Sequence, residues 1–370
     1  VRVTTEAKRS PVRNSAAAEG YIIPKGDRGM KRKAIVIGLV VLGLASATTV
    51  CGDKIRMVDG RVTENVEVLE ETYETVTYKI GGVKQEESAA DVLEVIHEDP
   101  PIAYRSAQSA EDKGEYIRAA GEYENAAKGR GGLWIGQYGY FRAGECYRKA
   151  GDPKSAAEAY KNLLKAHPKT IHYGPAKLGL GRTLAALGSY DEARSAFSEL
   201  EKEAKAKDLG EQYVFAARLE LARTFEIQER KPEAAKIYRK LALEAKRKHP
   251  EVGFAARLGE LRTTGGRRAA EELAKLIDNT STPSSVRAGA YVLIGRLQQE
   301  AGNHKQALLS FLRVCFDPPL AGFPEERAEG LYRAAEALEK VKTQDWRERA
   351  EALRSELRSR YPNTKWAQQL

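Results

Sequence analysis

The stretch LGLGRTLAALGSYDEARSAFSEL, residues 178–200, decides the fold because its parts return along the chain. The triplet LGR at Leu180–Arg182 comes back as LAR at Leu221–Arg223 and as IGR at Ile294–Arg296. Alanines equivalent to the one in the second half of the stretch follow each other at intervals of 36 to 43 residues: Ala119, Ala156, Ala193, Ala234, Ala270, Ala307 and Ala350. Such a period is typical of stacked pairs of helices.

The residues around these alanines have steric roles that support the repeat. Four residues after the alanine, one helical turn further, stands an aromatic ring: Tyr123, Tyr160, Phe197, Tyr238 and Phe311. Five residues before it stands a glycine suited to a turn between helices: Gly114, Gly151, Gly188, Gly265 and Gly302. Twelve residues before it stands a small residue that lets two helices approach closely: Gly144, Gly181, Ala222 and Gly295. The fifth unit departs from this pattern, because Ala274 takes the place of the ring.

This order of small, glycine, alanine and aromatic positions, closed by a proline, resembles the tetratricopeptide repeat. It is carried most fully by residues 140–168, 177–197 and 291–319, and the resemblance spans about residues 102–366. The phrase AAEAYKNLLKAHP is similar to the variants of bacterial envelope proteins. The resemblance implies a mainly α fold, an α-solenoid of about seven helix-turn-helix units.

The resemblance also implies where partners bind. In this family the first helices line a concave groove, and the residue after the small position faces it. That residue is Arg182, Arg223 or Arg296 in three units and Glu145 in a fourth, and Phe141 would add an apolar floor. Such arginines suit acidic peptides, because guanidinium groups bind carboxylates in forked pairs. The alternatives are that the arginines are solvated or paired with glutamates of the adjacent helix, and that Phe141 belongs to the core.

A small β module precedes the helices. Apolar residues alternate from Ile55 to Val83, and Asp59-Gly60 and Gly81-Gly82 are typical hairpin turns. The opening DKIRMVDGR is similar to short Sm-like or SH3-like β units. We expect four or five antiparallel strands that serve in packing or docking.

The N-terminal region has the three parts of a secretory signal peptide. Met30 is followed by three basic residues, an apolar run from Ala34 to Leu44, and the small residues Ala45-Ser46-Ala47. We expect export to the periplasm or cell envelope, with cleavage after Ala47. A retained segment would instead anchor the chain to a membrane.

These features divide the chain into four parts. Residues 1–29 are interpreted as a disordered extension upstream of the true start, residues 30–47 as a signal peptide, residues 48–101 as the β module, and residues 102–370 as the solenoid.

Composition argues against nucleic acid as the partner. The net charge is +9, but residues 1–47 carry +6 of it, so the exported part would be only mildly basic. Cys51, Cys146 and Cys315 form no disulfide framework or metal motif, and the latter two are expected to be buried.

Catalytic and cofactor motifs are not recognisable. The five histidines form no HExxH pattern, and the chain has no P-loop, GxSxG or dinucleotide motif. We therefore expect a non-enzymatic scaffold for protein or peptide partners, without cofactor or metal. Two alternatives stay open: a nucleic-acid binder that uses a Sm-like module and a basic solenoid, and an enzyme with a site where the β module meets the helices.

Overall fold

The computed structural model describes residues 52–98, 100–129, 133–320 and 322–370. The expected upstream extension, the signal peptide and Cys51 lie outside these residues and stay predictions. The helices of the described part include none that is long and apolar enough to cross a membrane.

Five antiparallel strands open the described chain, as the alternating pattern predicts: β1 (Asp53–Met57), β2 (Val62–Glu71), β3 (Thr75–Ile80), β4 (Val83–Ser88) and β5 (Val92–Ile96). They form one sheet in the order β4-β3-β2-β1-β5. Gly60, Gly81 and Gly82 take the positive φ angles that the tight turns require. Ile55, Met57 and Val76 are buried, so alternation gives the sheet an apolar face.

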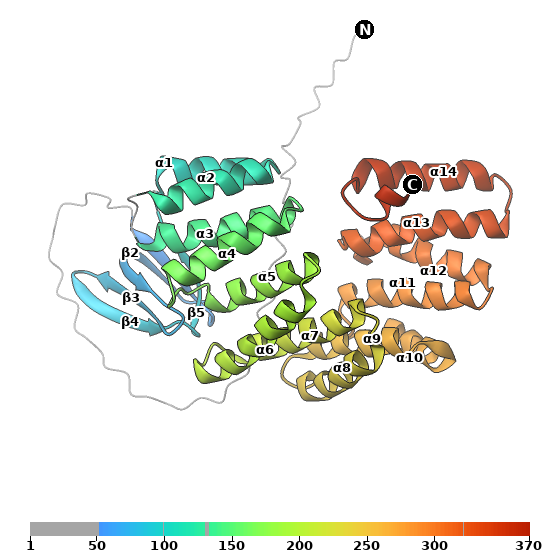
Figure 1. Ribbon diagram of the computed structural model, residues 1–370, viewed down its shortest axis with the longest axis horizontal. Helices are drawn as coiled ribbons and strands as arrows, with labels where there is room; N and C mark the ends of the chain where they lie inside the picture. Colours follow the sequence, from blue (N-terminus) through green and yellow to red (C-terminus); the bar gives the residue numbers. More distant parts are fainter. Residues whose placement is uncertain (1–51, 99, 130–132, 321) are drawn as a thin grey trace, which may run out of the picture. The chain divides into compact units, whose positions relative to one another are not determined.

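Fourteen α-helices follow in the described residues and form seven consecutive pairs (Figure 1). The first helices of the pairs are α1 (Ile102–Asp112), α3 (Leu133–Lys149), α5 (Tyr173–Ala186), α7 (Glu211–Ile227), α9 (Pro250–Thr264), α11 (Ser284–Glu300) and α13 (Pro324–Val341). The second helices are α2 (Tyr116–Lys128), α4 (Pro153–Ala166), α6 (Tyr190–Ala206), α8 (Lys231–Ala245), α10 (Gly266–Asp278), α12 (His304–Phe316) and α14 (Trp346–Arg360). The predicted α-solenoid of seven helix-turn-helix units, preceded by an antiparallel β module, is therefore confirmed.

The residues of the repeat pattern occupy the predicted environments. The five rings are at most 1% exposed, and they belong to the largest fully buried side chains: Tyr123, Tyr160, Phe197, Tyr238 and Phe311. The turn glycines Gly114, Gly151, Gly188 and Gly302 share φ angles of 76–78°. A Cβ on Gly295 would lie 2.5 Å from the Phe311 ring, so this position requires glycine for the close approach.

The register of the fifth unit corrects the prediction. The buried alanine of α10 is Ala269, not Ala270, and Leu273 takes the place of the ring at 0% exposure. Only Gly265 separates α9 from α10, whereas three residues separate the helices of the first four hairpins. The short connection therefore shifts the pattern of α10 by one residue. Leu273, and not Ala274, occupies the position that an aromatic ring takes in the other units.

The described chain divides into two compact units, and this division does not follow the boundary between strands and helices. The first unit contains the sheet and α1–α4, because Glu71 of β2 contacts Gln137 and Tyr138 of α3. The second unit contains α5–α14 together with Thr72–Glu74, which pairs with Thr170.

Candidate functional site

The first helices of the second unit form a continuous layer. Helices α5, α7, α9, α11 and α13 each contact the next helix of this series. We call these five helices the first-helix layer. The tetratricopeptide-like pattern placed three of the predicted binding residues on it.

Small and threonine side chains bring these helices together. Ala217 and Thr224 are at most 1% exposed on α7, and Ala256 and Thr263 are buried at the same spacing on α9. The Thr224 hydroxyl donates to the carbonyl of Glu220 at 2.8 Å, so its polar group is satisfied inside its own helix. The helices can therefore approach closely without leaving a buried hydroxyl unpaired.

Arg182 and Arg223, from neighbouring helices, meet on one buried carboxylate. Glu220 of α7 accepts hydrogen bonds from the Arg182 guanidinium of α5 at 2.7 and 3.0 Å. It also accepts one from Arg223, one turn further along α7, at 2.8 Å. The Glu220 side chain is 9% exposed, whereas Arg182 and Arg223 are 38% and 45% exposed. The pairing alternative considered for the arginines is therefore present, but both guanidinium groups still reach solvent.

The electrostatics of this trio leave positive charge at the surface. Burial favours the neutral form of Glu220, but Arg223 and Arg182 outweigh it and lower the pKa of the carboxyl below its usual value. Glu220 is therefore ionised at neutral pH and carries one negative charge against two positive ones. Both guanidinium groups, which carry the two positive charges, are more than a third exposed.

Two more glutamates of the layer are engaged in the same way. Glu226 of α7 accepts from Arg262 of α9 at 2.9 Å and from the Tyr238 hydroxyl of α8 at 2.8 Å. Glu260 of α9, 7% exposed in its side chain, pairs with Arg239 at 2.8 Å. Buried carboxylates thus hold neighbouring helices of the second unit together by charge-assisted hydrogen bonds.

The other predicted binding residues are Arg296, Phe141 and Glu145. Arg296 of α11 is half-buried, and no ion pair involves it within the part of the chain that the structure describes. Phe141 and Glu145 belong to the first unit, where both contact Tyr160: the Phe141 ring lies 6.4 Å from its ring, and Glu145 accepts its hydroxyl hydrogen bond. Phe141 is 9% exposed, so it contributes to the hairpin core.

The buried glutamates were missed in the sequence. Glu220 lies between Ala217 and Thr224, at helical spacing on the stripe that faces neighbouring helices. Glu260 lies between Ala256 and Thr263 in the same manner. A glutamate between an alanine and a threonine on one helix face, with an arginine three residues away, is the sequence pattern that would have indicated these buried glutamates.

His97 of the first unit was also missed as a charged group. Its side chain is 4% exposed, and its ring nitrogens lie 3.3 Å from an Asp53 oxygen and 2.8 Å from a Glu71 oxygen. The ring stacks on Trp134 at a centroid distance of 4.1 Å, and the Tyr138 hydroxyl donates to Glu71 at 2.8 Å. These residues fasten β1, β2 and the end of β5 to α3.

Burial alone would lower the pKa of His97, but the hydrogen bonds and charges of Asp53 and Glu71 raise it to about 9. The imidazolium is therefore the form present at neutral pH. A cation enclosed at 4% exposure is out of reach of a substrate, so the arrangement suits a structural ion-pair network.

The described residues do not support a metal-binding site. They contain no group of three or more His, Cys, Asp or Glu side chains that could hold an ion. Cys146 and Cys315 are buried as expected, and burial raises the pKa of each thiol to about 12.

Comparisons with known proteins agree with this architecture. Residues 104–170 and 147–209 each match a family model described as tetratricopeptide repeat. A search of curated proteins gave no match.

Several solved structures are similar to this chain. A tetratricopeptide repeat protein from Parabacteroides merdae has a TM-score of 0.45 at 18% identity, over 57% of this chain and 75% of that one. The Rap conjugation gene regulator of plasmid pLS20, in complex with the Phr* peptide, has a TM-score of 0.43 at 15% identity, over 70% and 74%. The C-terminal part of a repeat protein from Cytophaga hutchinsonii has a TM-score of 0.38 at 15% identity, over 72% and 98%.

Proposed function

This chain is a tetratricopeptide-repeat protein with an N-terminal antiparallel β module, and from that premise we propose that it is an exported, non-enzymatic scaffold for protein or peptide partners. The proposed binding surface is the first-helix layer of the second unit. The proposed partners carry acidic segments.

The trio of Glu220 with Arg182 and Arg223 carries this proposal. A pair that only held two helices together would need one arginine for one carboxylate. Here a second arginine is present, and both guanidinium groups are more than a third exposed beside a fixed negative charge. A carboxylate of a partner would bind the exposed side of these guanidinium groups. Arg296 adds a further cation to the same layer.

Export is proposed from the sequence of residues 30–47, which lie outside the described residues. The absence of a recognisable catalytic motif and the enclosure of the His97 cluster support a binding role. The proposed location is the periplasm or cell envelope, and a bacterial envelope type of repeat protein fits both.

The test compares proteins captured from an envelope extract by residues 48–370 and by variants of this fragment. Removing both Arg182 and Arg223 would leave Glu220 buried and unpaired, which typically costs several kcal/mol. We therefore combine Arg182→Gln, Arg223→Gln and Arg296→Gln with Glu220→Gln, and use Glu220→Gln alone as the matched control. Circular dichroism verifies that each variant keeps its helices.

The expected result is capture by the wild type and by the control, with loss of the same partners from the four-residue variant. Equal capture by all three proteins would contradict binding through these arginines. Cell fractionation and N-terminal sequencing test export separately. Finding the protein in the cytoplasm with residues 30–47 still attached would contradict export.

A further inference from the structure

The hairpin of α9 and α10 is built differently from the others of the second unit. Gly265 alone connects the two helices, with φ 61° and ψ −165°, and Gly266 also takes a positive φ of 76°. A connection of one residue does not let α10 fold back along α9 as the three-residue turns do. Helix α10 accordingly packs more extensively on α11 than on α9.

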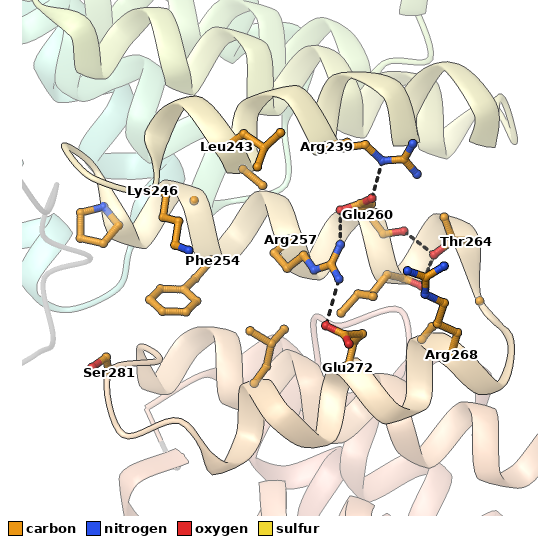
Figure 2. A pocket seen from close by; sticks show the side chains of 17 residues that line it. Arg239, Leu243, Lys246, Phe254, Arg257, Glu260, Thr264, Arg268, Glu272 and Ser281 are labelled. Carbon is orange, nitrogen blue, oxygen red and sulfur yellow. Dashed lines mark hydrogen bonds and ion pairs between the residues drawn. The ribbon is translucent and has the colours of Figure 1, made fainter.

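This departure opens a pocket of about 950 Å³ between α8, α9 and α10 (Figure 2). Its volume lies within the range of pockets that hold ligands, about 300–1,000 Å³. All of its lining residues belong to the second unit, and they do not include Arg182, Arg223 or Arg296, the three predicted binding residues of the first-helix layer.

One end of the pocket is apolar. Leu243 of α8, Phe254 of α9 and Leu276 of α10 line it, and Leu243 is 74% exposed. A leucine left this open to water on a folded helix is a candidate contact for an apolar side chain of a partner. Figure 2 shows Leu243 and Phe254 on the same side of the pocket as Lys246.

The other end is charged and partly neutralised. Arg257 of α9 pairs with Glu260 at 2.5 Å and with Glu272 of α10 at 3.1 Å, and Arg239 of α8 pairs with Glu260 at 2.8 Å. These contacts fix the floor of the pocket (Figure 2). Two arginines and two glutamates thereby balance each other's charge.

Two cationic side chains of the pocket take no part in these ion pairs. Lys246 and Arg268 are exposed, and neither forms an ion pair with any residue in the described ranges. They stand at opposite ends of the pocket: the Lys246 backbone approaches Gly253, while Arg268 lies in the first turn of α10 beside Thr264 (Figure 2). With Glu260 and Glu272 balanced by Arg239 and Arg257, the pocket has a net charge of about +2.

The spacing of these cations defines the length of a ligand. From Gly253 to Thr264 helix α9 rises about 16 Å, at ~1.5 Å per residue. An extended peptide covers this distance in about five residues, at ~3.3 Å each. Acidic residues at the two ends of such a segment would meet Lys246 and Arg268, and the apolar side chains that follow the residue at Lys246 would meet Leu243, Phe254 and Leu276.

The geometry points to this pocket as a second peptide-binding site of the chain, distinct from the cluster of Arg182, Glu220 and Arg223. Its ligand is an extended segment of five or six residues of a partner protein, with large apolar side chains between two terminal acidic residues. This inference rests on the proposed function, since it assumes that partners are proteins, and it places a specific contact away from Arg182, Arg223 and Arg296.

The test measures fluorescence polarisation of the labelled peptide acetyl-DLFLLD-amide with residues 48–370. Its control is acetyl-DDLFLL-amide, which has the same composition but places both charges at one end. The pocket variant combines Lys246→Glu with Arg268→Glu. The matched control combines Arg247→Glu with Arg267→Glu, since these exposed neighbours on the same chain segments do not line the pocket.

We expect saturable binding of the first peptide that weakens about tenfold or more in the pocket variant, as two lost ion pairs and two new repulsions imply. The control variant binds within about twofold of the wild type. Leu243→Ser weakens binding as well, whereas Leu309→Ser, at a leucine of α12 that is 65% exposed, does not.

No saturable binding up to about 1 mM peptide would overturn the inference. So would equal affinity for the two peptides, or equal losses in the pocket and control variants. The two proposals fail separately, because the residues changed in the four-glutamine variant do not line the pocket. Capture by the wild type that the four-glutamine variant loses, without saturable peptide binding, would contradict the pocket alone. Peptide binding that depends on Lys246 and Arg268, with equal capture by the wild type and the four-glutamine variant, would contradict the proposed function alone.

Discussion

The charge of His97 makes the stability of the first unit depend on pH. The folded chain holds the pKa of His97 at about 9, against a reference value of 6.5. A difference of this size corresponds to about 3 kcal/mol of stabilisation by the imidazolium. Because the folded-state pKa is the higher one, this contribution is fully present below pH 6.5. It declines as the pH rises from 6.5 to about 9 and is lost above that.

The perturbation is His97→Gln, measured at pH 6 and at pH 9.5. Urea unfolding is followed by the fluorescence of Trp134, which stacks on His97, in a background with Trp346→Phe and Trp366→Phe. Trp346 and Trp366 lie in the second unit, so the signal reports the first.

The free-energy difference between wild type and His97→Gln should shrink by about 3 kcal/mol between the two pH values. Other groups that titrate in this range act on both proteins and cancel in the difference. The same difference at pH 6 and pH 9.5 would refute a charged His97 between two carboxylates.

Three substitutions and one chemical modification test the packing of the chain. Glu220→Gln should destabilise the second unit by about 2 kcal/mol in urea unfolding, because it removes a buried charge that accepts from two arginines; an unchanged midpoint would contradict this. Gly295→Ala should lower stability by about 1–3 kcal/mol, since its Cβ would meet an aromatic ring at 2.5 Å. Gly121→Ala, with open space around it in α2, should instead raise stability by about 0.5–1 kcal/mol, and a loss at both glycines would argue against the close-approach explanation. Cys146 and Cys315 should resist iodoacetamide at pH 8 until urea is added, as peptide mass spectrometry would reveal; rapid labelling in the folded chain would contradict their raised pKa values.

The hairpin units could be predicted from sequence because each recurring residue is required by the local geometry of its own helix pair. A ring such as Tyr160 fills the space between two helices, and a glycine such as Gly151 permits a positive φ. Because every unit has the same geometry, these residue types recur in the sequence at the spacing of the units. The β module was predictable for the same reason, since alternation and turn residues act over a few positions.

The charged contacts were not predictable in the same way, because they join residues that are distant in sequence. Arg182 and Glu220 are 38 residues apart, and His97 reaches Glu71 across 26 residues. Arginines and glutamates are frequent in this chain, and composition does not say which of them pair. The shifted register at Leu273 was missed because the shorter turn moves the pattern of α10 by one residue.

Hydrogen exchange of the captured complex shows whether partners contact the first-helix layer. Residues 48–370 are compared free and bound, with peptide-level mass spectrometry over α5 to α12. We expect slower exchange in α5, α7 and α11, which carry Arg182, Arg223 and Arg296. Protection confined to α6 and α12, with the first helices unchanged, would contradict it.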